Sequence, residues 1–333
     1  MWNMFSLLSQ DIQNIIVFDL EWNQSGYNPN HRMPHEIIEI GACRVDRAGN
    51  VVSRFSELIR PRVYKRLDKH IKQVTGITEQ ELAQGRSFSD VFGDFIAWCG
   101  EDAQLVTWGR DDYPVLKRNA AFFMTPMPFA PPIDAQLVFG FCCLGGEHKQ
   151  MNLHAAMELM NVELAHRAVN DAECTAALLP VVDRAVTALA PERRMQLEHI
   201  LEKESRIAAS ALRSLPTPYM FQTDALADQR LMSLPCPACG KRTAFDTPWF
   251  DGGRERYLAI SVCPQHGFVY GQMHFKRTSA NTLIMPQRAY PASREDVEDV
   301  RERYRLYLLT PPKKRHHRLN MEEIVEKAEK AGE

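Results

Sequence analysis

The sequence predicts an α/β domain built around a mixed β-sheet, followed by a small second domain of different composition. Three strand-like stretches come first, and a further strand then alternates with helical stretches. Consecutive strands followed by strand–helix alternation are typical of a mixed sheet. Beyond about residue 231 the chain becomes rich in Cys, Gly, Pro and short aromatic stretches, which indicates a separate small domain.

The first three predicted strands lie close together in the chain. The first is a β-branched and aromatic run that is short and has no helical period, formed by Ile15, Ile16, Val17, Phe18 and Leu20. Two more strands are expected over 36–46 and 51–61, joined by a Gly-containing turn at 47–50.

Helical periodicity begins after these strands. Apolar residues at three- and four-residue spacing predict a helix over 87–99, with Ser87 as its N-cap. A fourth strand is expected over 103–108. Four more helices are expected at residues 113–123, 134–144, 152–161 and 171–188.

These patterns divide the chain into four segments. They are the α/β domain at 1–188, a charged helical connector at 189–230, the Cys-rich domain at 231–280, and a helix with a basic, loosely structured tail at 281–333.

Composition limits the classes of function. The chain has 333 residues, of which 45% are hydrophobic and 25% charged, and its net charge is −2. It therefore has no general positive field, and a polyanion must be bound by local patches. The absence of an apolar run of about 18–20 residues predicts no membrane span, and the first residues lack the features of a signal peptide. The cysteine spacing suggests a reducing compartment, so the predicted location is cytoplasmic.

Two acids end the first predicted strand. Asp19 and Glu21 are two residues apart, so both point to one face of the sheet, together with Asn23. One interpretation is a strand that simply ends in solvent. The other is a site for a divalent cation, because neighbouring carboxylates repel each other unless something neutralises them.

Further acids occur at two later positions. Asp111 and Asp112 fall between the fourth strand and the next helix, and His166 precedes Asp171 by five residues. Asn170 with Glu173 resembles a capping box, which would place Asp171 in the first turn of a helix and His166 on the loop entering it.

These motifs together resemble the DEDDh 3′→5′ exonucleases, the DnaQ-like branch of the ribonuclease H fold. The resemblance covers about residues 13–187 and rests on FDLEWNQ, PHEIIEIGA, VTGIT, WGRDD and HRAVNDAECT. Within this family, the sequence most resembles the KapD and Eri-like exonucleases. It implies a ribonuclease H-like mixed five-stranded sheet flanked by helices. In the Eri-like branch the ligand of the second motif is the last residue of W-G-x-x-D, which implies Asp112, with Asp111 as a solvated neighbour.

The resemblance also implies a chemistry. Asp19, Glu21, Asp112 and Asp171 would hold two Mg²⁺ or Mn²⁺ ions, for which carboxylate oxygens are suitable ligands. His166 would accept a proton from the attacking water. The products would be nucleoside 5′-monophosphates released from single-stranded 3′ ends.

Substrate contacts are implied at two places. Trp22 and Asn23 follow the paired acids, and Gly76 and Ile77 lie in the VTGIT stretch; in relatives these positions lie near the terminal nucleotides. The alternative for Trp22 and Ile77 is packing under the sheet.

The second domain contains two metal-binding motifs. Cys236 with Cys239, and Cys263 with His266, have the spacing of the two knuckles of a zinc ribbon. A redox Cys-x-x-Cys is the alternative, but it leaves the second pair unexplained. The zinc would be structural. Mixed basic and aromatic residues nearby favour a nucleic-acid contact; solvated charge around a small core, or a protein partner bound through the ribbon, are the alternatives.

The leading hypothesis is a 3′→5′ exonuclease that acts on RNA in preference to DNA. The first alternative is the same chemistry on DNA, since recognition of the 2′-OH depends on contacts that short motifs do not reveal. The second is a binding module without turnover, against which the complete set of acids argues.

Overall fold

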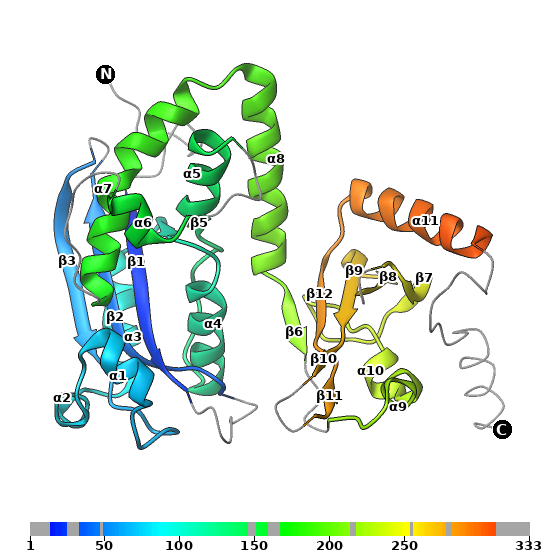
Figure 1. Ribbon diagram of the computed structural model, residues 1–333, viewed down its shortest axis with the longest axis horizontal. Coiled ribbons are helices and arrows are strands. Elements are labelled where there is room, and N and C mark those ends of the chain that lie inside the picture. The colour runs from blue at the N-terminus through cyan, green and yellow to red at the C-terminus, as the bar shows by residue number, and fades with distance from the viewer. Residues whose placement is uncertain are drawn as a thin grey trace. The chain divides into compact units, whose positions relative to one another are not determined.

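The computed structural model describes residues 14–24, 33–46, 49–145, 151–158, 167–213, 218–253, 256–277 and 281–310. Contacts divide the chain into two compact units, Met1–Ala208 and Ala209–Glu333, which we call unit 1 and unit 2. Figure 1 labels the elements of both units.

Unit 1 is built on a five-stranded mixed sheet of strand order β3-β2-β1-β4-β5. β1 pairs antiparallel with β2, and β2 with β3, whereas β1–β4 and β4–β5 are parallel pairs. The strands are β1 (Asn14–Asn23), β2 (Glu36–Val45), β3 (Val51–Leu58), β4 (Ala103–Thr107) and β5 (Ile133–Asp134). The predicted mixed five-stranded α/β fold is confirmed.

Helices cover both faces of this sheet. α7 contacts β1, β2 and β3, and it lies in front of them in Figure 1. The helices of unit 1 are α1 (Lys69–Thr75), α2 (Glu79–Gln84), α3 (Phe88–Cys99), α4 (Asp112–Phe122), α5 (Ala135–Cys143), α6 (Leu153–Glu158), α7 (Ala168–Thr187) and α8 (Pro191–Ala208).

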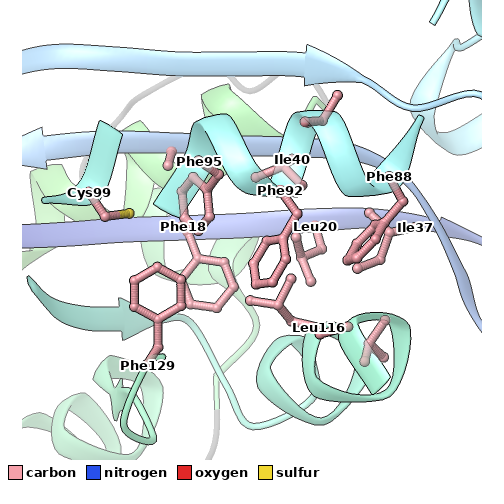
Figure 2. Packing of buried hydrophobic residues seen from close by; sticks show 14 of the residues in the cluster. Phe18, Leu20, Ile37, Ile40, Phe88, Phe92, Phe95, Cys99, Leu116 and Phe129 are labelled. Carbon is pink, nitrogen blue, oxygen red and sulfur yellow. The ribbon is translucent and has the colours of Figure 1, made fainter. Parts of the chain in front are cut away.

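Alternation along β1 assigns its side chains to two separate cores. Phe18 and Leu20 pack into the cluster formed with α3 and α4, whereas Ile15 and Val17 pack into the cluster that contains α7 residues. Figure 2 shows the first cluster, in which Phe92 of α3 points toward β1. Truncation of such a fully buried aromatic side chain costs about 3–5 kcal/mol.

Local sequence signals explain where the best-predicted helix begins. Ser87 accepts a hydrogen bond from the backbone N–H of Asp90 and caps α3, as predicted. The N-cap predicted at Asn170 is wrong: α7 begins at Ala168, with Arg167 in the capping position, and this places Asp171 in its first turn.

Unit 2 contains a second five-stranded sheet, of order β6-β12-β9-β8-β7, in which every pair is antiparallel. Two short strands, β10 and β11, form a separate pair. The elements are β6 (Ala211–Arg213), α9 (Gln222–Ala227), α10 (Gln229–Met232), β7 (Ala244–Asp251), β8 (Arg256–Cys263), β9 (Gly267–His274), β10 (Lys276–Arg277), β11 (Leu283–Ile284), β12 (Gln287–Pro291) and α11 (Arg294–Leu309).

The second sheet extends beyond the limits expected for the Cys-rich domain. β6 lies within the predicted helical connector at 189–230, and β12 lies beyond residue 280. The division at Ala208 assigns α8 to unit 1 and the remainder of the connector to unit 2. The predicted final helix is present as α11, and the predicted tail at 311–333 lies outside the described residues.

Within the described residues, no helix has both the length and the hydropathy needed to cross a bilayer.

Candidate active site and candidate zinc centre

The candidate active site begins with the orientation of two acids on β1. The odd-numbered residues Ile15 and Val17 face α7, so Asp19 and Glu21 lie on that same face of the sheet. Asp171 occupies the first turn of α7. Carboxylate oxygens of Asp19, Glu21 and Asp171 all lie within 4.8 Å of one another. The structure thus brings together acids from two of the sequence motifs.

Asp112 joins this group from a third element. It is the first residue of α4 and is 6% exposed. Its Oδ1 atom accepts a hydrogen bond from the backbone N–H of Leu20 at 3.1 Å, immediately beside Asp19. Asp111, by contrast, is exposed and makes no side-chain cap for α4. Of the two acids in this motif, only Asp112 is directed at β1.

Three of these acids, Asp19, Glu21 and Asp112, are poorly suited to being charged without a counterion. Burial raises the pKa of Asp19 well above its ordinary value, and the carboxylates of Asp112, Asp171 and Glu21 raise it further. Burial and then Asp171 raise the pKa of Glu21 to about 8. Burial raises the pKa of Asp112 to about 7, although the N–H of Leu20 opposes this shift. Such a set of oxygen donors fits a divalent cation, which would remove the repulsion.

A cavity of about 520 Å³ opens beside these acids. Its walls include Asp19 and Asp112 and, in addition, the side chains of Trp22, Trp108, Arg110, Asp111 and Gln136. Trp22 also packs against the ring of His35, with 5.9 Å between ring centroids. Two tryptophans and Arg110, whose Nη1 atom lies 3.7 Å from Glu204 Oε2, therefore line the cavity next to the carboxylates, a combination suited to a nucleotide. The sequence analysis did not assign a role to Trp108, Arg110 or Gln136, because Trp108 and Arg110 lie in the loop between β4 and α4 and Gln136 lies on α5.

Glu39 and Arg167 form an ion pair that fixes the start of α7. Glu39 is fully buried on β2, opposite Glu21. Arg167 Nη2 lies 2.6 Å from Glu39 Oε1, and its Nε lies 3.0 and 3.1 Å from the two carboxylate oxygens. The backbone N–H of Ala168 donates to Glu39 Oε2 at 3.3 Å, so Glu39 supplies the acceptor that an N-cap side chain usually provides.

The same helix end packs against a glycine of β2. A Cβ atom on Gly41 would lie 2.0 Å from the backbone nitrogen of Val169 and 2.1 Å from the carbonyl carbon of Ala168. The absence of a side chain at residue 41 therefore allows α7 to approach the sheet. Sequence analysis missed this role of Glu39 and Gly41, although an acid inside an otherwise apolar strand signals a buried partner.

The predicted substrate residues take different positions. The pairing of β1 with β2 shifts register between Glu21 and Trp22, where Ile38 of β2 has no partner on β1, and Trp22 packs in the same cluster as Phe18 and Leu20. Asn23 is fully buried, its amide donates to the carbonyl oxygen of Arg66 at 2.9 Å, and its carbonyl oxygen accepts from the N–H of Asp68 at 3.0 Å.

The VTGIT stretch lies at the junction of α1 and α2. Ile77 is fully buried in a cluster with Ile38 and Leu82, in agreement with the packing alternative. Gly76 ends α1 with a φ of 69°. His166 lies outside the described residues.

The candidate zinc centre lies in unit 2. The ligand atoms of Cys236, Cys239, Cys263 and His266 lie within 4.8 Å of one another. Cys239 Sγ is 3.9 Å from Cys263 Sγ, and His266 Nδ1 is 3.6 and 3.5 Å from the sulfurs of Cys236 and Cys263. A tetrahedral zinc with bonds of about 2.3 Å to sulfur and about 2.0 Å to nitrogen requires ligand separations of roughly 3.5–3.8 Å. The donor set and its spacing therefore fit zinc.

Sequence comparisons show a relationship to exonucleases. The family model described as Exonuclease (RNase_T) matches residues 16–179. The chain is 34% identical over 121 residues to the probable 3′-5′ exonuclease KapD of Bacillus subtilis, covering 34% of this chain and 56% of that protein. It is 28% identical over 169 residues to the PolC-type DNA polymerase III of B. subtilis, covering 50% of this chain and 11% of that protein.

The chain thus spans about half the length of the first of these relatives (56%). Among solved structures, the nuclease domain of 3′hExo, a DEDDh family member bound to rAMP, aligns with a TM-score of 0.47 and 19% identity, covering 54% of this chain and 96% of that one.

Proposed function

Since residues 16–179 belong to the exonuclease family RNase_T, we propose that the protein is a metal-dependent 3′→5′ exonuclease acting on single-stranded nucleic acid. The observation that carries the proposal is the convergence of Asp19, Glu21 and Asp171 within 4.8 Å, since carboxylates with raised pKa values beside a cavity are typical of a metal-assisted hydrolase.

Each residue has a proposed task. Asp19, Glu21, Asp112 and Asp171 hold two divalent ions, Mg²⁺ or Mn²⁺. Such ions, when bound, stabilise the negative charge that develops on a scissile phosphate. His166 accepts the proton of the attacking water as general base. The water oxygen bonds to phosphorus and the bond from phosphorus to the 3′-oxygen of the preceding nucleotide breaks, so the products are nucleoside 5′-monophosphates.

The cavity residues position the strand. Trp22 and Trp108 present aromatic faces on which the terminal base can stack, and Arg110 presents its guanidinium to a phosphate. Asn23 and Ile77 act indirectly, because they hold the segments beside the site rather than the substrate. Gly76 remains a candidate for backbone contact at the junction of α1 and α2.

We propose RNA as the preferred substrate, on the strength of the motif resemblance to the KapD and Eri-like exonucleases. DNA is the second candidate, which the relationship to the PolC-type DNA polymerase favours. Matched 5′-labelled RNA and DNA strands of one sequence, incubated with Mg²⁺ or Mn²⁺, distinguish the two.

The test of the activity itself compares the wild type with Asp171→Asn. We expect the wild type to shorten the labelled strand one nucleotide at a time and the variant to leave it intact. The circular dichroism spectrum of the variant should be unchanged, which shows that it is folded. Equal release of nucleotides by both proteins would contradict the assignment.

We also propose that Cys236, Cys239, Cys263 and His266 hold a structural zinc ion. Cys236 and Cys263 belong to the hydrophobic cluster of unit 2, so the ion would connect two segments of its core. A site of this kind needs reduced thiols, which supports the expected cytoplasmic location.

A further inference from the structure

Unit 2 carries a group of polar and cationic side chains on one face of its antiparallel sheet. The strand register pairs Arg256 with His274, and Gln272 with both Leu258 and Arg288. Directly opposed residues of antiparallel strands lie on the same face, and His274 and Gln272 are two residues apart on β9. Arg256, Gln272, His274 and Arg288 therefore share one face that spans β8, β9 and β12.

The two ends of this face have different environments. At one end Ile260 and Tyr270 are directly opposed and lie on this same face of the sheet. They pack against Val297 and Val300 of α11. At the other end Arg256 and Arg288 are exposed, and Gln272 and His274 are half-buried. Polar side chains on neighbouring strands, about 4.8 Å apart, thus line a part of the face that is accessible to a ligand.

The charges at this end are of one sign. Burial lowers the pKa of His274, and the nearby charges of Lys276, Arg288 and Arg256 lower it further. Within the described part of the chain, none of these three cations forms an ion pair. The arginines of α11 differ, since Arg294 pairs with Glu298 and Arg305 with Glu302. The cluster is therefore a local positive patch on a chain of net charge −2.

We propose that this cationic face, on which Arg256 and Arg288 with the nearby Lys276 carry the charge and Gln272 and His274 lie beside them, binds the phosphate backbone of a nucleic-acid strand. The inference rests on the proposed function, which supplies the reason to prefer a nucleic acid over an acidic protein segment. Guanidinium groups match phosphate oxygens through paired hydrogen bonds, and Gln272 adds an amide donor between the cations. The contact is with the backbone, so it is independent of base sequence.

The test measures binding apart from turnover. The full-length protein carries Asp19→Asn, so that the strand is not shortened, and its Kd for a 5′-labelled single strand is determined by fluorescence anisotropy across a salt series. Removing two phosphate contacts by Arg256→Gln with Arg288→Gln should make the slope of log K against log salt shallower by about 1.4 and raise Kd on the order of tenfold near 0.1 M salt. The matched control is Arg294→Gln with Arg305→Gln, which changes the net charge by the same amount. It should leave Kd and the salt slope nearly unchanged, apart from a small effect of the altered net charge.

Two results would overturn the inference. One is an unchanged Kd and slope in the Arg256/Arg288 variant, or equal changes in the control. The other is loss of binding to poly-glutamate in that variant with unchanged binding of the strand, which would assign the face to an acidic protein. Failure of the proposed exonuclease function can be distinguished from failure of this inference. A wild-type protein that binds strands through this face but releases no nucleotides contradicts only the exonuclease activity.

Discussion

The Oδ1 atom of Asp112 accepts a hydrogen bond from the backbone N–H of Leu20 at 3.1 Å, which joins the first residue of α4 to β1. This bond sets the direction of the Asp112 carboxylate, because Leu20 follows Asp19 directly. Asp111 precedes it in the sequence but is exposed. The two neighbouring acids therefore provide a matched pair for substitution.

We expect Asp112→Asn to remove nearly all nucleotide release, whereas Asp111→Asn should change the rate by less than about threefold, because Asp111 is exposed at the wall of the cavity and is not a proposed metal ligand. The side-chain amide introduced by Asp112→Asn can still accept from the N–H of Leu20, so the comparison isolates the charge. Initial rates with a 5′-labelled strand measure the effect, and melting temperatures check the fold. The reverse ranking would place the ligand one residue earlier.

His166→Ala should reduce kcat by about 10² to 10⁴-fold, the usual contribution of a positioned general base. Metal affinity should stay unchanged, because the metal ligands in this proposal are carboxylates. The pH–rate profile of the wild type should fall on the acidic side, and this limb should be absent from the variant. An unaltered profile and rate would mean that another group accepts the proton.

The ion pair between Glu39 and Arg167 should act on catalysis by positioning. Glu39→Gln removes the charge that holds Arg167 and weakens the acceptor for Ala168, so the first turn of α7 and Asp171 should shift. We expect kcat to fall about 10- to 100-fold with little change in KM, since a small misplacement of a reacting group can have an effect of this size. Stability should fall by about 1–3 kcal/mol, less than for a fully buried pair, because the Arg167 side chain is 35% exposed.

The control for this experiment lies on the same helix. Glu173 of α7 pairs with Arg54, whose side chain is 60% exposed. Glu173→Gln should change stability by less than about 1 kcal/mol and leave kcat unchanged, as for other surface ion pairs. A fall in kcat of the same size in both variants would mean that α7 responds generally to loss of an ion pair.

Sequence patterns predicted the parts of the site that depend on short-range regularity. Alternation along β1 predicted that Asp19 and Glu21 share a face, and Ser87 marked the start of α3. The bulge at Ile38 of β2 was not predictable, since nothing in the β2 sequence signals an extra residue in the pairing with β1. The hydrogen bonds of Asn23 to the backbone of Arg66 and Asp68 likewise depend on a segment distant in sequence.

Long-range partners account for the other differences. α7 begins at Ala168 because Glu39 of β2, far away in sequence, provides an acceptor for its first N–H group. A local capping pattern at Asn170 cannot reveal this. Likewise β6 and β12 join the second sheet through pairings between distant segments, and each is too short for a period-two pattern to identify it.

The zinc proposal predicts that removing two of the ligands disrupts the structure of unit 2 alone. Cys236→Ser with Cys239→Ser should eliminate zinc from the protein, measured by elemental analysis, and should change the fluorescence of Trp249, which is buried in the same cluster. Release of nucleotides from short strands should persist, because the candidate acids belong to unit 1. Cys142→Ser with Cys143→Ser is the control: these thiols lie in unit 1, and zinc content should not change. Full zinc content in the first variant would contradict the site.

The raised carboxyl pKa values predict how pH and Mg²⁺ together affect stability. The pKa of Glu21 is about 8 in the folded protein, against 4.5 for an ordinary glutamate. Between these values the folded chain retains a proton that the unfolded chain has released, so without added metal the free energy of unfolding should fall as pH rises. The effect is on the order of 2 kcal/mol between pH 5 and pH 8.

Bound Mg²⁺ favours the charged carboxylates and should cancel the trend, so the increase in melting temperature on adding Mg²⁺ should be larger at pH 8 than at pH 6. Glu21→Gln should reduce the pH dependence, whereas Asp111→Asn should change it less, because the Asp111 charge acts on Asp112 and not on Glu21. A wild-type protein whose stability rises from pH 6 to pH 8 without added metal would show that these carboxylates are stabilised in some other way.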